Sequence, residues 1–150
     1  MKTQPAVRLL LILALLTACS TPAEPSDGIQ RPATLAGTAW RVVSVGGRAP
    51  VALAVPTAMF GTDRVTGSGG CNSYGGSYRY DPGTGRIEMR ELGMTAMACA
   101  EGPRNDFEGL FVQALGQANL VAVDGQGRLG RSGPGGLVVL ERDPQGAVEG

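Results

Sequence analysis

One glycine-rich stretch and the cysteine motif that closes it decide how this sequence folds. They read Gly67-Ser68-Gly69-Gly70-Cys71-Asn72-Ser73-Tyr74-Gly75-Gly76-Ser77-Tyr78 and, after a hairpin, Met94-Thr95-Ala96-Met97-Ala98-Cys99. Glycines allow a bulge or a tight crossing where one backbone passes close to another. We therefore expect this region to bring short strands together. Two of the three cysteines in the chain stand in it.

The composition favours a small β-rich domain. The 150 residues include 24 glycines, and only 5% are aromatic, which suits short strands joined by turns better than a helical bundle. Strands are predicted at 40–45, 59–60, 64–66, 77–80, 86–90, 120–123, 128–129 and 137–140. Trp40, the only tryptophan, is expected in the core. The run Asp81-Pro82-Gly83-Thr84-Gly85 predicts the turn of a hairpin.

One helix interrupts the strands. Apolar residues recur with helical spacing at Phe107, Leu110, Phe111, Ala114 and Leu115. Asn105 with Glu108 three residues later resembles a capping box, and Gly116 is a candidate end. The predicted fold class is therefore mainly β with one helix (α+β), with small antiparallel strands.

The N-terminus has the pattern of a bacterial export signal. Residues 1–18 carry Lys2 and Arg8 before an apolar run that is much shorter than the roughly twenty residues needed to cross a bilayer. The residues before Cys19 are similar to a lipoprotein cleavage box. We expect cleavage there and lipid on the Cys19 thiol, the alternative being an ordinary secretory signal. Ser20 follows, and by resemblance to Gram-negative lipoproteins the lack of aspartate at this position indicates the outer membrane, facing the periplasm.

The rest of the chain divides into three parts. Residues 19–34 contain three prolines and little to bury, so an extended, mobile linker is predicted. The folded domain is expected at 35–142 and a frayed tail at 143–150. Lipid on the protein would make the membrane its first partner.

Cys71 and Cys99 remain once Cys19 carries lipid. Thiols oxidise outside the cytoplasm, so a mutual disulfide is the simplest interpretation, with a contribution of about 3–4 kcal/mol. A redox-active or metal-binding pair is the alternative. The two residues do not form a C-x-x-C motif, and two sulfurs without histidine make a poor zinc site.

No catalytic, cofactor or metal site is predicted. Histidine is absent, which removes His-based acid–base chemistry and Ser-His-Asp triads. The glycine run is not a dinucleotide fingerprint, because Asn72 replaces the last glycine; Asn72 is expected to bridge turn backbone groups. Balanced charges, 13 basic and 13 acidic, give no indication of nucleic-acid binding. Carboxylates that look like solvated surface charge are Glu88, Glu91, Glu101, Asp106 and Glu108.

Together these motifs resemble the META domain, and most closely the small heat-inducible bacterial lipoproteins of that family. The resemblance covers about residues 35–142. It rests on Gly67, Gly70, Cys71, Asn72, Thr95, Met97 and Cys99, and on a helix with Glu108 and Leu115. Members often have a basic residue after the threonine, where Ala96 stands here. The resemblance implies a compact, barrel-like domain, an envelope setting, and an association with stress or with tolerance of antibiotics such as novobiocin.

Two functions fit this description. The first is a non-enzymatic, monomeric envelope module that binds or protects another, unidentified envelope protein under stress. The second is a carrier of a small hydrophobic ligand inside the barrel. The adaptable apolar residues that suggest a carrier are Met59, Phe60, Met89, Met94 and Met97.

Overall fold

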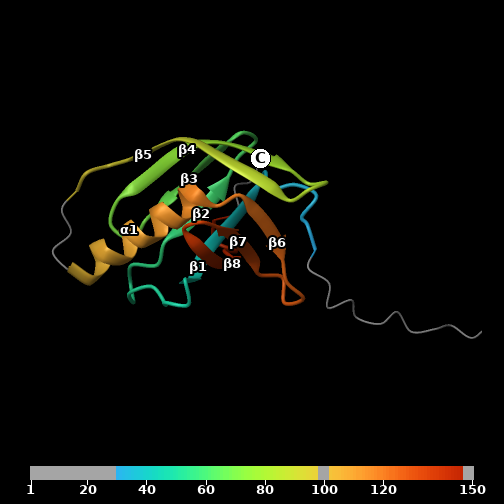
Figure 1. The fold of residues 1–150 in the computed structure, drawn as a ribbon. Coiled ribbons are helices and arrows are strands. Elements are labelled where there is room, and N and C mark those ends of the chain that lie inside the picture. Colours follow the sequence, from blue (N-terminus) through green and yellow to red (C-terminus); the bar gives the residue numbers. More distant parts are fainter. Residues whose placement is uncertain (1–29, 98–101, 147–150) are drawn as a thin grey trace, which may run out of the picture.

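The computed structural model describes residues 30–97 and 102–146, which form a closed antiparallel barrel and one helix (Figure 1). The elements are β1 (Thr38–Val45), β2 (Thr57–Phe60), β3 (Arg64–Ser68), β4 (Ser73–Asp81), β5 (Arg86–Met94), α1 (Gly102–Gln117), β6 (Leu120–Val123), β7 (Leu129–Gly133) and β8 (Gly136–Arg142). Each strand pairs with the next, and β8 pairs with β1 to close the barrel. The predicted fold class, mainly β with one helix, is confirmed.

The β4–β5 hairpin is built by its turn residues. The two carboxylate oxygens of Asp81 accept hydrogen bonds from the Gly83 amide at 2.9 Å and the Thr84 hydroxyl at 2.6 Å. The ladder above the turn holds one irregularity, where Gly75 pairs with Gly93 but Ser77 pairs with Arg90. A β-bulge of this kind bends and twists the strand.

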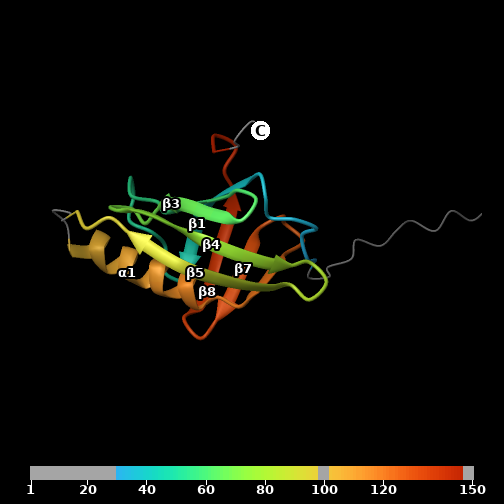
Figure 2. The ribbon, with the colours of Figure 1, turned by 90° about the horizontal axis from the view of Figure 1, so that it is seen from above.

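Helix α1 packs against β5, β7, β8 and β1 and connects the two barrel strands that pair least. Strands β5 and β6 share a single register pair, Arg86 with Leu120, and α1 is the segment that connects them. Figure 2 shows the helix lying alongside β5. Its side chains Phe111 and Leu115 are fully buried. The helix begins at Gly102, so the prediction that Asn105 forms the N-cap is wrong; Pro103 occupies the first turn, where its missing N–H costs nothing.

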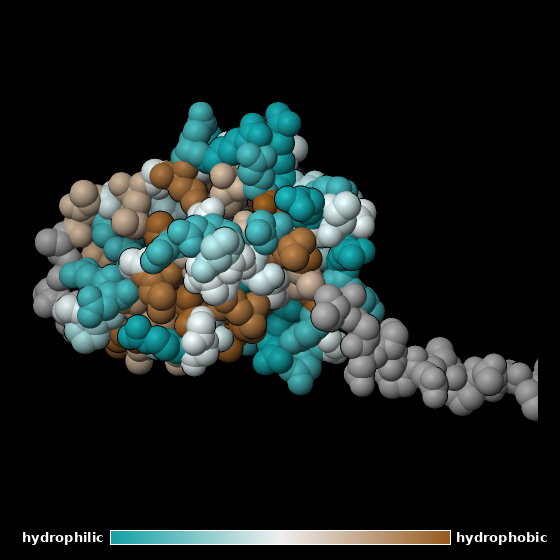
Figure 3. Space-filling model, in the orientation of Figure 1, coloured by the Kyte–Doolittle hydropathy of each residue, from teal (hydrophilic) through white to brown (hydrophobic). Residues whose placement is uncertain are grey.

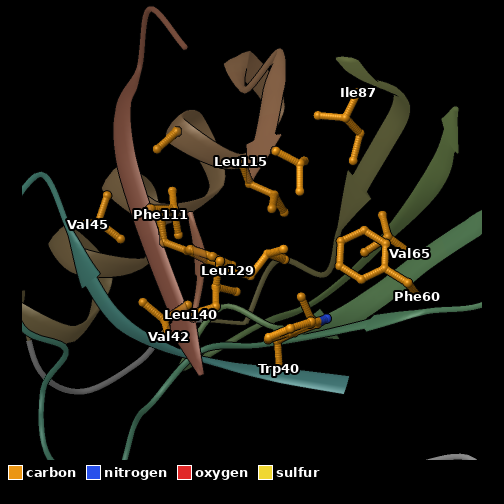
Figure 4. Packing of buried hydrophobic residues seen from close by; sticks show 14 of the residues in the cluster. Trp40, Val42, Val45, Phe60, Val65, Ile87, Phe111, Leu115, Leu129 and Leu140 are labelled. Atoms are coloured by element: carbon orange, nitrogen blue, oxygen red, sulfur yellow. The ribbon is translucent and has the colours of Figure 1, made fainter. Parts of the chain in front are cut away.

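The barrel interior is packed with side chains. Figure 4 shows Trp40, Val42, Phe60, Leu129 and Leu140 pointing toward one another between the strands, and each is at most 3% exposed. The indole N–H of Trp40 donates to the Thr38 hydroxyl at 2.7 Å, which satisfies its one polar atom.

Of the four methionines in the described residues, only Met89 packs against that interior. Met94 and Met97 are 45% and 59% exposed, while Met59 and Met89 are half-buried. Only Phe60 of the proposed ligand-lining set belongs to the buried core. A carrier site inside the barrel therefore has no support from these side chains.

The end of the predicted linker is part of the folded unit. Gln30 exchanges two backbone hydrogen bonds with Val123, at 2.9 and 2.6 Å, and the Tyr80 hydroxyl donates to the Pro32 carbonyl at 2.8 Å. Residues 30–34 thus lie against the barrel beside β6, because β6 offers backbone groups there that β5 does not pair. The predicted signal and Cys19 lie outside the described residues. Within the described ranges, no helix has the length and apolar character needed to cross a membrane.

Candidate functional site

The two sequence motifs meet at one end of the barrel. The first motif forms the end of β3, the loop to β4 and the first part of β4, and the second begins at Met94, the last residue of β5. They are joined where Thr95 donates its backbone N–H to the Ser73 carbonyl at 3.0 Å and its hydroxyl accepts from the Ser73 N–H at 3.1 Å. The long β4–β5 hairpin thereby brings together residues more than twenty positions apart.

The Asn72 side chain is the centre of this meeting point. Its amide oxygen accepts hydrogen bonds from the Met97 N–H at 2.6 Å and the Thr95 hydroxyl at 3.0 Å. Its amide nitrogen donates to a Glu108 carboxylate oxygen at 2.7 Å and to the Met97 carbonyl at 3.3 Å. All four hydrogen-bonding positions of the amide are used, and Asn72 is only 5% exposed.

The prediction that Glu108 is a solvated surface charge is wrong. The residue is only 4% exposed. One carboxylate oxygen accepts from the backbone N–H groups of Asn72 and Cys71 at 2.6 and 3.1 Å, and the other accepts from the Asn72 amide. Glu108 precedes Phe111 by three residues and Leu115 by seven. This helical spacing puts all three on the same, buried face of the helix, and it is the sequence signal from which the burial of Glu108 could have been predicted.

The ionised form of Glu108 is favoured in this site. Burial raises the pKa of the carboxyl group, but the hydrogen bonds from the Asn72 side chain, the Asn72 N–H and the Cys71 N–H outweigh that effect and hold the pKa below its usual range. Two amide N–H groups of a loop therefore bind a fixed negative charge on the helix.

Two motif glycines allow the backbone to pack this closely. A side chain at Gly67 would overlap the Thr57 carbonyl oxygen, and a Cβ at Gly70 would lie 2.7 Å from the Ala54 carbonyl oxygen. Gly70 also has φ of +111°, which other residues rarely adopt. Both glycines are needed for the loop that presents Cys71 and Asn72 to Glu108.

The remaining motif residues are Met97, Cys71 and Cys99. Met97 contributes its N–H and carbonyl, and its side chain points outward. The Cys71 sulfur lies 3.6 Å from the Met97 carbonyl oxygen. Cys99 falls outside the described residues, so the Cys71–Cys99 bridge stays a prediction.

The comparisons with known proteins agree with this motif and fold. A family model for the META domain matches residues 33–141.

The chain belongs to the META domain family. An NMR structure of a protein from Burkholderia xenovorans matches with a TM-score of 0.61 and 24% identity, over 73% of this chain and 84% of that one. A second NMR structure matches with a TM-score of 0.58 and 22% identity, over 71% of this chain and 90% of that one. Both show likeness of fold alone. No curated protein matches the sequence significantly.

Within this META domain the motif residues form a network that holds structure together. We call Cys71, Asn72, Thr95, Met97 and Glu108 the motif network. Its amide, hydroxyl and carboxylate groups bind one another and thereby join the β3–β4 loop, the segment after β5 and the helix. Among the described residues, no group of three His, Cys, Asp or Glu side chains is placed to hold a metal ion.

A second buried charge lies on β7, inside the META barrel. Arg131 is fully buried, and its Nη2 donates to the Leu115 carbonyl at 3.3 Å near the end of α1. Its Nε and Nη1 have no hydrogen-bond partner within the described part of the chain, and Phe60 lies 5.9 Å away beneath the guanidinium. Burial lowers the pKa of Arg131 to about 10, so the side chain stays charged at neutral pH. Arg131 follows the buried Leu129 by two residues on the same strand, and side chains at this spacing point to the same face of a sheet. This spacing is the sequence signal for the burial of Arg131.

The outer face of the META barrel carries a groove of about 600 Å³ across β6, β7, β8 and β1. Leu120 and Leu137, 46% and 49% exposed, line it together with Val139. Such a volume lies in the range of small-molecule sites in proteins. Figure 3 shows that hydrophobic areas also lie between hydrophilic ones on the face of the molecule that it draws.

Proposed function

We propose that this protein is a non-catalytic module of the bacterial cell envelope, held by lipid on Cys19 at the outer membrane and facing the periplasm. There its META domain binds or protects another envelope protein under stress. The observation that carries the proposal is the closed hydrogen-bonding of the motif network. Residues that define the motif stabilise the barrel, which leaves its outer surface as the part available to a partner.

The position of the first described residues supports a tethered arrangement. Gln30 pairs with Val123 at the edge of β6, so the chain leaves the barrel from a fixed point. Ten residues separate that point from the lipid that we propose on Cys19, with Ser20 as the first. An extended chain of that length spans up to about 35 Å. The domain can therefore stand clear of lipid head groups while staying in the same compartment as its partner.

Cys19→Ala tests the anchor and the role together. Cells lacking the gene are complemented with the wild-type chain or with the Cys19→Ala chain, fractionated, cross-linked and challenged with heat or novobiocin. We expect wild type in the outer-membrane fraction with a reproducible cross-linked protein and restored survival, and Cys19→Ala away from that fraction with survival reduced. Unchanged survival on deletion, with no cross-linked protein, would contradict the proposal.

We propose as a second candidate function the carriage of a small hydrophobic ligand at a site on the outside of the barrel. The specific observation that favours it is the groove beside Leu120 and Leu137, because the interior is filled by core side chains. An apolar recess of ligand size on a rigid sheet is a common form of binding site.

A further inference from the structure

The outer groove has an apolar side and a polar side. Along β7 and β8 its lining combines the small residues Gly130 and Ser132 with the larger Leu137 and Val139. The small residues lie on β7 and the larger ones on the neighbouring β8, which gives a hollow that runs across the sheet. Such a shape suits an unbranched apolar chain better than a bulky ring system.

The polar side of the groove has an excess of positive charge. Arg128 is paired with Asp124, with 2.8 Å between Nε and Oδ2. Arg31 is exposed and forms no ion pair within the described ranges; its Nη1 donates only to the Gly83 carbonyl, at 3.2 Å. The Asp81 carboxylate interacts with Arg31 electrostatically but forms no ion pair with it. One guanidinium without a direct carboxylate contact therefore borders the apolar hollow.

A further cation lies behind the groove. Arg131 stands on β7 between the groove residues Gly130 and Ser132 but points into the barrel, where no carboxylate of the described chain pairs with it. A buried charge is screened by salt much less than an exposed one. Its field adds to that of Arg31, so the groove attracts negative charge.

We propose that the outer groove binds a single-chain carboxylic acid of the fatty-acid class. The alkyl chain lies against Leu137 and Val139, and the carboxylate pairs with Arg31, whose planar guanidinium can donate two parallel hydrogen bonds to it. One guanidinium without a direct carboxylate contact at the rim matches one negative charge on the ligand. This inference rests on the second function proposed above and names its ligand class.

The test uses two photoreactive probes on the full chain: dodecanoic acid with a diazirine near its methyl end, and the matching alcohol. After irradiation, labelled peptides are located by mass spectrometry. We expect the acid to label the peptide containing Leu137 more strongly than the alcohol does. Arg31→Gln should reduce labelling by the acid about threefold, as expected for loss of one exposed charge pair, and leave labelling by the alcohol unchanged.

Two further variants control this experiment. Arg64→Gln removes an exposed arginine of β3 that does not line the groove, and labelling should equal that of wild type. Leu137→Asn should reduce labelling by both probes. Equal labelling by acid and alcohol, insensitive to Arg31→Gln, would overturn the acidic ligand and leave the carrier function standing. If neither probe labels the groove, the acidic ligand and the carrier function are both overturned.

Discussion

The Glu108 carboxylate and the Asn72 side-chain amide are in direct contact inside the protein, with 2.7 Å between Oε2 and Nδ2. This pair ties the first half of α1 to the loop between β3 and β4. Near the other end of the helix, Arg131 donates to the Leu115 carbonyl. Buried charged side chains thus contact both halves of the helix that connects β5 and β6.

Replacing Glu108 by Gln should destabilise the domain strongly. Glutamine has nearly the same shape, but its NH₂ group would either face the Asn72 amide nitrogen or replace the acceptor of the Cys71 and Asn72 N–H groups. A buried donor is left without an acceptor in both cases, which costs about 2–3 kcal/mol. Urea unfolding of Glu108→Gln measures the loss.

The matched control is Asp106→Asn, an exposed acidic residue on the same helix. Its free energy of unfolding should stay within about 0.5 kcal/mol of wild type. Equal effects of the two substitutions would show that Glu108 behaves as ordinary surface charge.

The pH dependence of stability should change with the same residue. The pKa of Glu108 is lower in the folded than in the unfolded chain, so the unfolded chain binds more protons in acid. The stabilisation is complete above the unfolded pKa of about 4.3 and is lost as pH falls through the folded pKa. Unfolding free energies at several pH values between about 6 and 3 should therefore fall less steeply for Glu108→Gln. Parallel curves for the two proteins would argue against this linkage.

Local signals in the sequence predict most of the barrel, but not its buried charges. Strand spacing, the turn after Asp81 and the apolar stripe of α1 are all present in the structure, because each depends on neighbouring residues. Glu108 and Arg131 are different. Their burial depends on acceptors and donors supplied by distant segments, and charged side chains are rarely buried without partners. Only their spacing from Phe111 and Leu129 indicated the inward face.

Arg131→Met should stabilise the domain. Methionine keeps much of the buried side-chain volume and removes a desolvated charge whose Nε and Nη1 have no partner in the described chain. We expect a gain of about 1–3 kcal/mol at neutral pH, similar to other replacements of buried charge by apolar side chains. Arg128→Met, which breaks an exposed pair with Asp124, should lose at most about 1 kcal/mol. A large loss of stability on Arg131→Met would contradict this account of the buried charge.

A Cys71–Cys99 bridge predicts a response to reductant. Reduction should add the mass of two hydrogens and lower the free energy of unfolding by about 3–4 kcal/mol. Cys71→Ser should reproduce the loss and no longer respond to reductant, whereas Cys19→Ala should respond as wild type does. Unchanged mass under reductant would contradict the bridge.

The motif residues form one structural network, and a double-mutant cycle between Asn72 and Glu108 tests this most directly. Unfolding free energies of wild type, Asn72→Ala, Glu108→Ala and the double variant give the coupling energy of the pair. The structure predicts a coupling of about 2 kcal/mol, because either single change removes most of what the second can remove. Additive losses within about 0.5 kcal/mol would contradict the network.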